Sequence, residues 1–316
     1  MRLLFFGTPA FAVPSLEGLI QGRQQIVGVI TQPDRPKGRS EKPAASAIKE
    51  TALHQHLPIL QPSDLKDPVF LKTVSDFKPD CGVVVAYGRI LPPALLKLFP
   101  HGVINLHASL LPKFRGAAPI QWALIQGESQ TGVTICRLDE QLDHGPILLQ
   151  ASHPIQPEDT AETLNRSLAT IGSRLLVDAV NQIESGQAKF QKQDDSLASH
   201  APPLKKEEGI LQWKEDCRQI HNRIRGVQPW PGATTWLNGK LLKILSSSFE
   251  PDKNNPTAQP GTVIAADQNQ GIWVQTGKGQ IGIHRLQLEG GRALNAPDFL
   301  RGHPIPPGSI LTSHYA

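Results

Sequence analysis

The chain has 316 residues, of which 39% are hydrophobic and 19% charged. This composition excludes a disordered protein, and the length accommodates two domains. The net charge of +4 is unevenly placed, because residues 1–203 carry 19 basic and 19 acidic side chains whereas residues 204–316 carry 13 and 9. The C-terminal third therefore either has an ordinary, slightly basic surface or meets a polyanion.

The first residues are apolar enough to suggest a signal peptide, but Gly7, Pro9, Pro14 and Glu17 interrupt them. A strand, a turn and a helix explain this stretch better. No run of about 18 apolar residues follows, so we expect no membrane span. The three cysteines form no CxxC pair, which argues against a zinc site or disulfides and favours a cytoplasmic location.

Short apolar segments alternate with helical patterns through the first half of the chain. Strands are predicted at residues 3–6, 26–31, 82–86, 103–106 and 132–138. Helices are predicted at residues 14–21, 44–54, 68–77 and 117–126. This alternation predicts an α/β fold with a Rossmann-like, doubly wound and mostly parallel sheet.

A long amphipathic helix is predicted at residues 159–185. Asp159 and Glu162 resemble a capping box at its start, and Gly186 supplies its end. The following residues 187–203 are polar and end on two prolines, which is typical of a linker. We therefore divide the chain into a catalytic domain at 1–186, a linker at 187–203 and a second domain at 204–316.

The second domain has a β pattern. After a helical segment at residues 215–225, strand-like runs lie at 234–237, 240–245, 262–265, 272–276 and 281–288. Asn238 and Gly239, between the first two runs, are a strong hairpin signal. A smaller β-barrel of five or six strands, OB-like in character, is the expected fold.

The segment at residues 102–127 carries the densest chemical signal. A predicted strand ends at Asn105 and His107, which lie two residues apart and so point to one side. Ligands of open α/β sheets bind beyond the carboxyl ends of strands. An amide and an imidazole there could polarise a carbonyl, and Asp143 after the next strand is a candidate orienter. The alternative is that Asn105 caps a turn and His107 is a satisfied core histidine.

The run Asn105-x-His107-x-Ser109-Leu110-Leu111-Pro112, with Gly116 and then Asp143 downstream, resembles the signature of the folate-dependent formyltransferases. The resemblance implies that Asn105, His107 and Asp143 are the catalytic residues. It also implies two folate-contacting stretches, which comprise Ser109, Leu110, Leu111 and Pro112, and Tyr87, Gly88, Arg89, Ile90 and Leu91.

Within that family the chain is similar to the methionyl-tRNA formyltransferases over nearly its whole length. The matching segments lie at residues 6–11, 31–39, 115–120, 204–208 and 229–232. The resemblance implies that a basic loop at residues 32–43 contacts the acceptor end of the initiator tRNA, although Glu41 interrupts its charges. The residues implied in tRNA binding are Arg35, Lys37, Arg39, Lys42, Lys205 and Lys206. A solvated surface loop is the alternative reading of the first four.

The implied reaction transfers the formyl group of 10-formyltetrahydrofolate to the amino group of methionine on the initiator tRNA. Neither GxGxxG nor GxxxxGK[ST] is present, so no NAD or ATP site is expected, and no metal is expected either. We expect a monomer without an obligate protein partner. The alternatives are a formyltransferase acting on a nucleotide-sugar amine, a formyltetrahydrofolate hydrolase-like protein and a catalytically silent RNA-binding protein.

Overall fold

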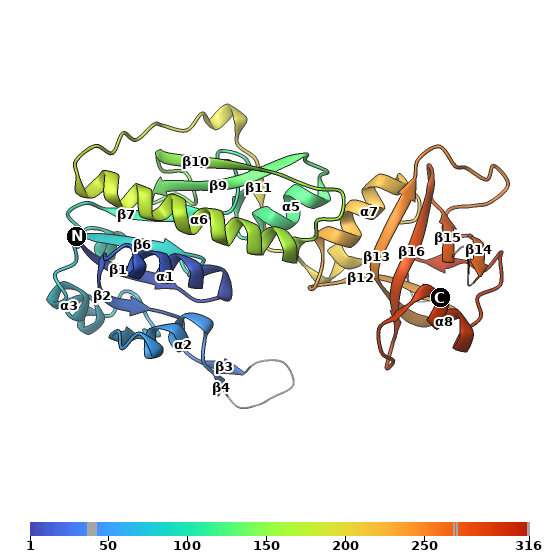
Figure 1. The fold of residues 1–316 in the computed structure, drawn as a ribbon, viewed down its shortest axis with the longest axis horizontal. Helices are drawn as coiled ribbons and strands as arrows, with labels where there is room; N and C mark the ends of the chain where they lie inside the picture. Colours follow the sequence, from blue (N-terminus) through green and yellow to red (C-terminus); the bar gives the residue numbers. More distant parts are fainter. Residues whose placement is uncertain (37–42, 268, 270, 315–316) are drawn as a thin grey trace. The chain divides into compact units, whose positions relative to one another are not determined.

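The computed structural model describes residues 1–36, 43–267, 269 and 271–314, and the chain forms two compact units. The first unit comprises residues 1–119, 130–154 and 165–202, and the second comprises residues 120–129, 155–164 and 203–316. Figure 1 shows layered helices and strands in the first unit and a curled sheet in the second. In the described part of the chain, no helix combines the length and the apolar character needed to cross a membrane.

A seven-stranded sheet forms the middle layer of the first unit. Its strands lie in the order β10, β9, β7, β6, β1, β2 and β5. Neighbouring strands from β7 to β5 are parallel, whereas β9 is antiparallel to both β7 and β10. The predicted doubly wound, mostly parallel sheet is confirmed. The bounds are β1 (Arg2–Gly7), β2 (Gln25–Ile30), β5 (Ile59–Leu60), β6 (Cys81–Val85), β7 (Val103–His107), β9 (Gln130–Arg137) and β10 (Ile147–Pro154).

Helices cover both faces of this sheet, as an α/β layer structure requires. On one face Gly172 of α6 lies against the side chain of Leu106, and α1 runs beside α6 (Figure 1). On the other face, Leu4 and Phe6 of β1 belong to one apolar cluster with side chains of α3 and α4. The bounds are α1 (Val13–Gln21), α2 (Ala47–His54), α3 (Pro68–Asp76), α4 (Pro93–Leu96) and α6 (Ala161–Glu184).

The long helix α6 matches the prediction except at its start. Thr160 is the N-cap, because its hydroxyl accepts a hydrogen bond from the backbone N–H of Thr163 at 3.3 Å and the Thr163 hydroxyl accepts one from the N–H of Thr160 at 3.0 Å. The capping pair predicted at Asp159 and Glu162 is therefore off by one residue. Gly186 ends the helix as predicted, with a φ of 71°.

The polar segment at residues 187–202 belongs to the first unit. Its Gln191 exchanges two backbone hydrogen bonds with Ile147, at 2.7 and 2.8 Å. Further on, β11 (His200–Ala201) pairs in parallel with β8 (Arg115–Gly116). These contacts tie the segment to the loops at the end of the sheet. The division into 1–186, 187–203 and 204–316 stays a prediction.

An antiparallel sheet forms most of the second unit, in the order β14, β15, β16, β13, β12 and β18, with β17 paired to β16. Its two ends meet, because Thr262 beside β14 bridges Ile310 beside β18. The sheet thus curls into the small barrel that the sequence predicted. The bounds are β12 (Ala233–Leu237), β13 (Lys240–Glu250), β14 (Val263–Asp267), β15 (Gly271–Gln275), β16 (Gln280–Leu288), β17 (Leu294–Asn295) and β18 (Leu311–Thr312).

Helices fill and flank this barrel. The apolar residues Ile220 and Ile224 of α7 (Cys217–Gly226) belong to one core cluster with side chains of every long barrel strand. A capping box begins α7. The Asp216 side chain accepts a hydrogen bond from the backbone N–H of Gln219, and the Gln219 side chain accepts one from the backbone N–H of Asp216. This unit also contains α8 (Ala296–Gly302), residues 120–125 of α5 (Pro119–Ile125) and residues 161–164 of α6.

Candidate active site

Asn105 and His107 lie on β7, where the sheet ends. Residue 105 pairs with Val84 of β6 and with Cys136 of β9, so the pair is placed by strands on both sides. Because side chains alternate along a strand, Asn105 and His107 share one face while Leu106 faces α6. Both side chains are buried. A buried amide and imidazole need hydrogen-bond partners, and those partners identify the site.

Asp143 lies in the loop between β9 and β10 and is 7% exposed. Its φ of 50° is in the left-handed region, which aspartate tolerates better than most residues. One carboxylate oxygen accepts from Asn105 Nδ2 at 3.3 Å, and the other accepts from the backbone N–H of Gly116 at 2.9 Å. The second oxygen also lies 3.5 Å from Nδ1 of His107. The three residues predicted as catalytic are therefore in contact with one another.

The ring of His107 has a defined orientation. Its Nε2 lies 2.9 Å from the carbonyl oxygen of Phe114, and a carbonyl can only accept, so Nε2 carries a hydrogen. Its Nδ1 faces the Asp143 carboxylate. With a hydrogen on both nitrogens, the ring would be an imidazolium that faces that carboxylate. The amide of Asn105 keeps a second N–H beyond the one used by Asp143, and that N–H can be donated to a reacting oxygen.

Arg115, Gln193 and Asp195 connect to this group through hydrogen bonds, and of these Gln193 and Asp195 carry no signal that marks them in the sequence. Arg115 is buried, and its guanidinium donates to Gln193 Oε1 at 3.1 and 2.7 Å and to Asp195 at 2.8 Å. Arg115 lowers the pKa of Asp195, with His144 as a lesser cause. Gln193 in turn donates to the backbone carbonyls of Asp143 and Gly145, both at 2.8 Å.

The first predicted folate stretch forms a hydrogen-bonded turn after β7. The Ser109 hydroxyl donates to the carbonyl of Lys113 at 2.6 Å, and the Ser109 carbonyl accepts from Thr134 at 2.7 Å. The carbonyl of Leu111 accepts from Gln150 at 2.9 Å. Ser109 is fully buried, so its hydroxyl shapes the turn, while Leu110 and Pro112 are partly exposed.

The second predicted folate stretch follows β6, the parallel neighbour of β7, so both stretches leave the same edge of the sheet. The carbonyl of Tyr87 accepts from Thr8 and Gln32, and burial raises the pKa of the Tyr87 phenol. Gly88 turns the chain with a φ of 80°. After it, Arg89 donates to the carbonyl of Pro62, Ile90 is 75% exposed and Leu91 is buried.

The residues predicted to bind tRNA fall on both units. Arg35 is exposed on the two-residue strand β3 (Arg35–Pro36), which pairs with β4 (Pro43–Ala44). Just before it, Asp34 accepts from Lys49 at 2.6 Å and from Gln61 at 2.7 Å, which anchors the hairpin and lowers the pKa of Asp34. Lys37, Arg39 and Lys42 lie outside the described residues. Lys205 and Lys206 are exposed on the second unit.

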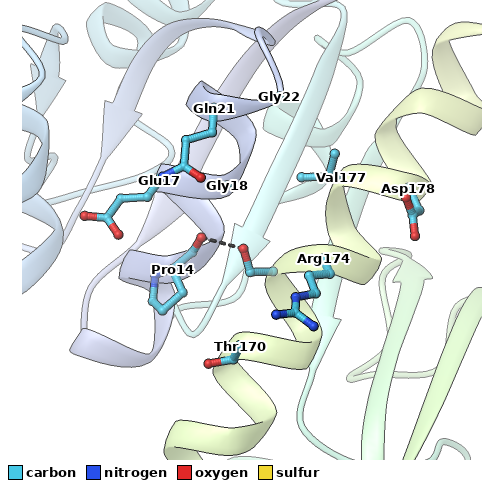
Figure 2. A pocket seen from close by; sticks show the side chains of 10 residues that line it. Pro14, Glu17, Gly18, Gln21, Gly22, Thr170, Arg174, Val177 and Asp178 are labelled. Carbon is cyan, nitrogen blue, oxygen red and sulfur yellow. Dashed lines mark hydrogen bonds between the residues drawn. The ribbon is translucent and has the colours of Figure 1, made fainter.

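A groove of about 490 Å³ lies elsewhere on the first unit, between α1 and α6. Figure 2 shows Glu17 on its α1 side and Arg174 and Asp178 on its α6 side, with Ser173 donating to the carbonyl of Pro14. Its walls include none of the predicted catalytic or folate residues, and its charges are of both signs. Within the described residues, no group of three His, Cys, Asp or Glu side chains is placed to bind a metal ion.

Comparison with known proteins identifies the family. The model named "Formyl transferase" matches residues 1–180, and the one named "Formyl transferase, C-terminal domain" matches residues 203–304. The methionyl-tRNA formyltransferases of Syntrophus aciditrophicus and Pelotomaculum thermopropionicum are 47% and 45% identical over 311 residues. These alignments cover 98% of this chain and 99% and 98% of the two relatives. The chain belongs to the methionyl-tRNA formyltransferase family.

This formyltransferase shares its fold with more distant enzymes. An N-formyltransferase from Helicobacter canadensis, solved with folinic acid and dTDP-3-aminofucose, aligns with a TM-score of 0.66 and 20% identity. That alignment covers 90% of this chain and 99% of the other. At this identity the likeness supports the fold alone. The predicted formyltransferase resemblance is confirmed by the family models and the relatives.

Proposed function

We propose that the formyltransferase moves the formyl group of 10-formyltetrahydrofolate onto the α-amine of methionine carried by the initiator tRNA. The observation that carries this proposal is the contact between Asn105, His107 and Asp143 at the end of β7. The amine nitrogen forms a bond to the formyl carbon, the carbonyl electrons move onto oxygen, and the bond from that carbon to the folate nitrogen then breaks. The proposed substrates put the reaction in the cytoplasm.

The residues present suit these steps. The free N–H of Asn105 stabilises the developing oxyanion, and the charged form of His107 adds to this stabilisation. Asp143 orients Asn105 and His107 and accepts the proton that the amine loses. That proton passes to the departing folate nitrogen, which needs it in order to leave as a neutral amine. No covalent enzyme intermediate is required.

The folate is proposed to bind along the edge formed by residues 87–91 and 109–112. A pteridine ring needs apolar contacts on its faces and backbone polar groups at its rim. The exposed side chain of Ile90 and the chain turn at Gly88 supply both kinds of group next to β6. The buried Ser109 hydroxyl stabilises the adjoining turn and is not needed as a ligand.

The tRNA is proposed to meet basic residues on both units. Arg35 with Lys37, Arg39 and Lys42 would contact the acceptor end, and Lys205 with Lys206 would contact phosphates. The excess positive charge of residues 204–316 supports this assignment, because phosphate contacts depend on Lys and Arg. The division into a catalytic domain and a tRNA-binding domain is part of the same proposal.

One assay tests the proposal against its alternatives. The enzyme is incubated with 10-formyltetrahydrofolate and either methionyl-tRNA or a nucleotide-linked amino sugar, and the formylated product is measured. Formylation of the tRNA alone is expected. Formylation of the sugar alone, release of free formate without transfer, or tRNA binding without any turnover would each replace the proposal by one of its competitors.

A further inference from the structure

The strap, defined here as residues 187–202, leaves the end of α6 and runs past β10 to β11 (Figure 1). Backbone hydrogen bonds attach it to the site loops at several points. Ser199 is one of these, since its carbonyl accepts from the N–H of Arg115 at 2.8 Å and its hydroxyl accepts from the N–H of Phe114 at 2.9 Å. The strap therefore has a defined path over the residues that surround Asp143.

Gln193 lies in the middle of the strap, and its side chain is buried, with 6% exposure. Its Oε1 accepts two hydrogen bonds from Arg115, and its Nε2 donates to the carbonyls of Asp143 and Gly145. A guanidinium can only donate and a carbonyl can only accept, so the amide has one orientation. Both ends of the side chain are fully used, which is the condition under which a buried amide orders its surroundings.

The hydrogen-bond partners of Gln193 lie in two segments, at Arg115 and at residues 143–145, and both segments orient the Asp143 carboxylate. Arg115 precedes Gly116, whose N–H donates to the Asp143 carboxylate. The carbonyls of Asp143 and Gly145 belong to the turn that carries the same carboxylate. His144 in that turn also lies between Asp139 at 2.8 Å and Asp195 of the strap at 3.5 Å. The strap thus fixes both segments relative to each other.

We propose that Gln193 is a positioning residue for formyl transfer, which keeps the Asp143 carboxylate in place against Asn105 and His107. This inference rests on the proposed function. Gln193 touches none of the reacting atoms and acts through the backbone of residues 143–145 and through Arg115. A displacement of about 1 Å in a catalytic group can cost roughly 100-fold in rate. We therefore expect loss of Gln193 to lower kcat about 10- to 100-fold.

The variant Gln193→Glu separates the two ends of the side chain. A carboxylate still accepts from Arg115, but it cannot donate to the carbonyls of Asp143 and Gly145. If Gln193 served only to accept hydrogen bonds from Arg115, the variant would keep its activity. Gln193→Met keeps the volume of the side chain and removes both the accepting oxygen and the donating N–H groups. It is measured alongside, so that the test can still be made if one of the two variants folds poorly. Gln191→Ala is the matched control, because Gln191 is exposed and pairs through its backbone.

The readouts are kcat, the KM for each substrate and the melting temperature. We expect a lower kcat for the Gln193 variants, KM values within about twofold, and normal values for Gln191→Ala. Each Gln193 variant is also combined with Asp143→Asn. A positioning residue should add little to the loss already caused by Asp143→Asn, whereas a merely structural residue should lower kcat by the same factor in both backgrounds.

The outcomes distinguish the inference from the proposed function. Normal kcat in both Gln193 variants, or equal factors in the two backgrounds, overturns the positioning role while the wild type still formylates methionyl-tRNA. A wild type that does not formylate methionyl-tRNA overturns the proposed function instead. An Asp143→Asn variant with full activity removes Asp143 from the mechanism, and the positioning role of Gln193 with it, while the proposed function stands.

Discussion

Gly116→Ala tests how closely the catalytic carboxylate depends on the backbone beside it. Gly116 has a φ of 129°, which side chains rarely allow, and an added Cβ would lie 2.5 Å from the carbonyl oxygen of Ala201. Backbone strain of this kind costs about 1–3 kcal/mol, and forcing an atom into a packed contact costs about 1–3 kcal/mol more. We expect the free energy of unfolding to fall by roughly 2–6 kcal/mol, measured by urea titration.

The same change should also reduce catalysis. Relief of the contact must move the pairing of β8 with β11, and with it the Gly116 N–H that donates to Asp143. We expect kcat to fall by about 10-fold or more in the molecules that fold. Gly186→Ala is the control. Its φ is 71°, but no described atom lies within 4 Å of the added Cβ.

The control variant should lose about 1–2 kcal/mol from the left-handed backbone alone and keep its kcat. Equal losses of stability in the two variants would show that the contact with Ala201 costs nothing. A Gly116→Ala enzyme with normal kcat would refute the link between this backbone and the carboxylate.

Asp143→Asn should lower kcat about 100-fold with tRNA affinity unchanged, and near-normal turnover would remove Asp143 from the mechanism. Lys206→Ala should weaken all methionyl-tRNAs alike and reduce the salt dependence of binding by about one counterion, as filter binding across salt concentrations would measure. Burial and the nearby Arg225 lower the pKa of His221 below 6.5. The unfolded chain then takes up the proton first, so stability falls as pH drops below 6.5, and this fall should be shallower in His221→Gln.

The strands buried on both faces were predictable because such strands are nearly continuous apolar runs. In β1, five of the six residues are buried, and four of those are Leu or Phe. The sequence analysis missed the edge strand β10 because it is not a continuous apolar run. Exposed and half-buried residues alternate along most of its length. Its register against β9 decides its place, and register is a tertiary property that a single segment does not encode.

The grouping of the candidate catalytic residues was predictable from local geometry. Asn105 and His107 share a face because they are two residues apart on a strand, and Asp143 follows the next strand of the sheet. Direct hydrogen bonds between them are consistent with that placement. Their roles in catalysis stay predictions until the variants above are measured.

Gln193 could not be found in this way, because a polar segment between two domains has the same composition whether it is solvated or packed. An amide is the one uncharged side chain that can accept from a guanidinium at one end and donate to two carbonyls at the other. That requirement arises only after Arg115 and the turn at residues 143–145 have come together. Those partners are 78 and 50 residues away along the chain, so no local pattern contains them. A buried charge at this position would leave either the guanidinium or the carbonyls unpaired, and the cost of such unpaired groups explains why an amide stands there.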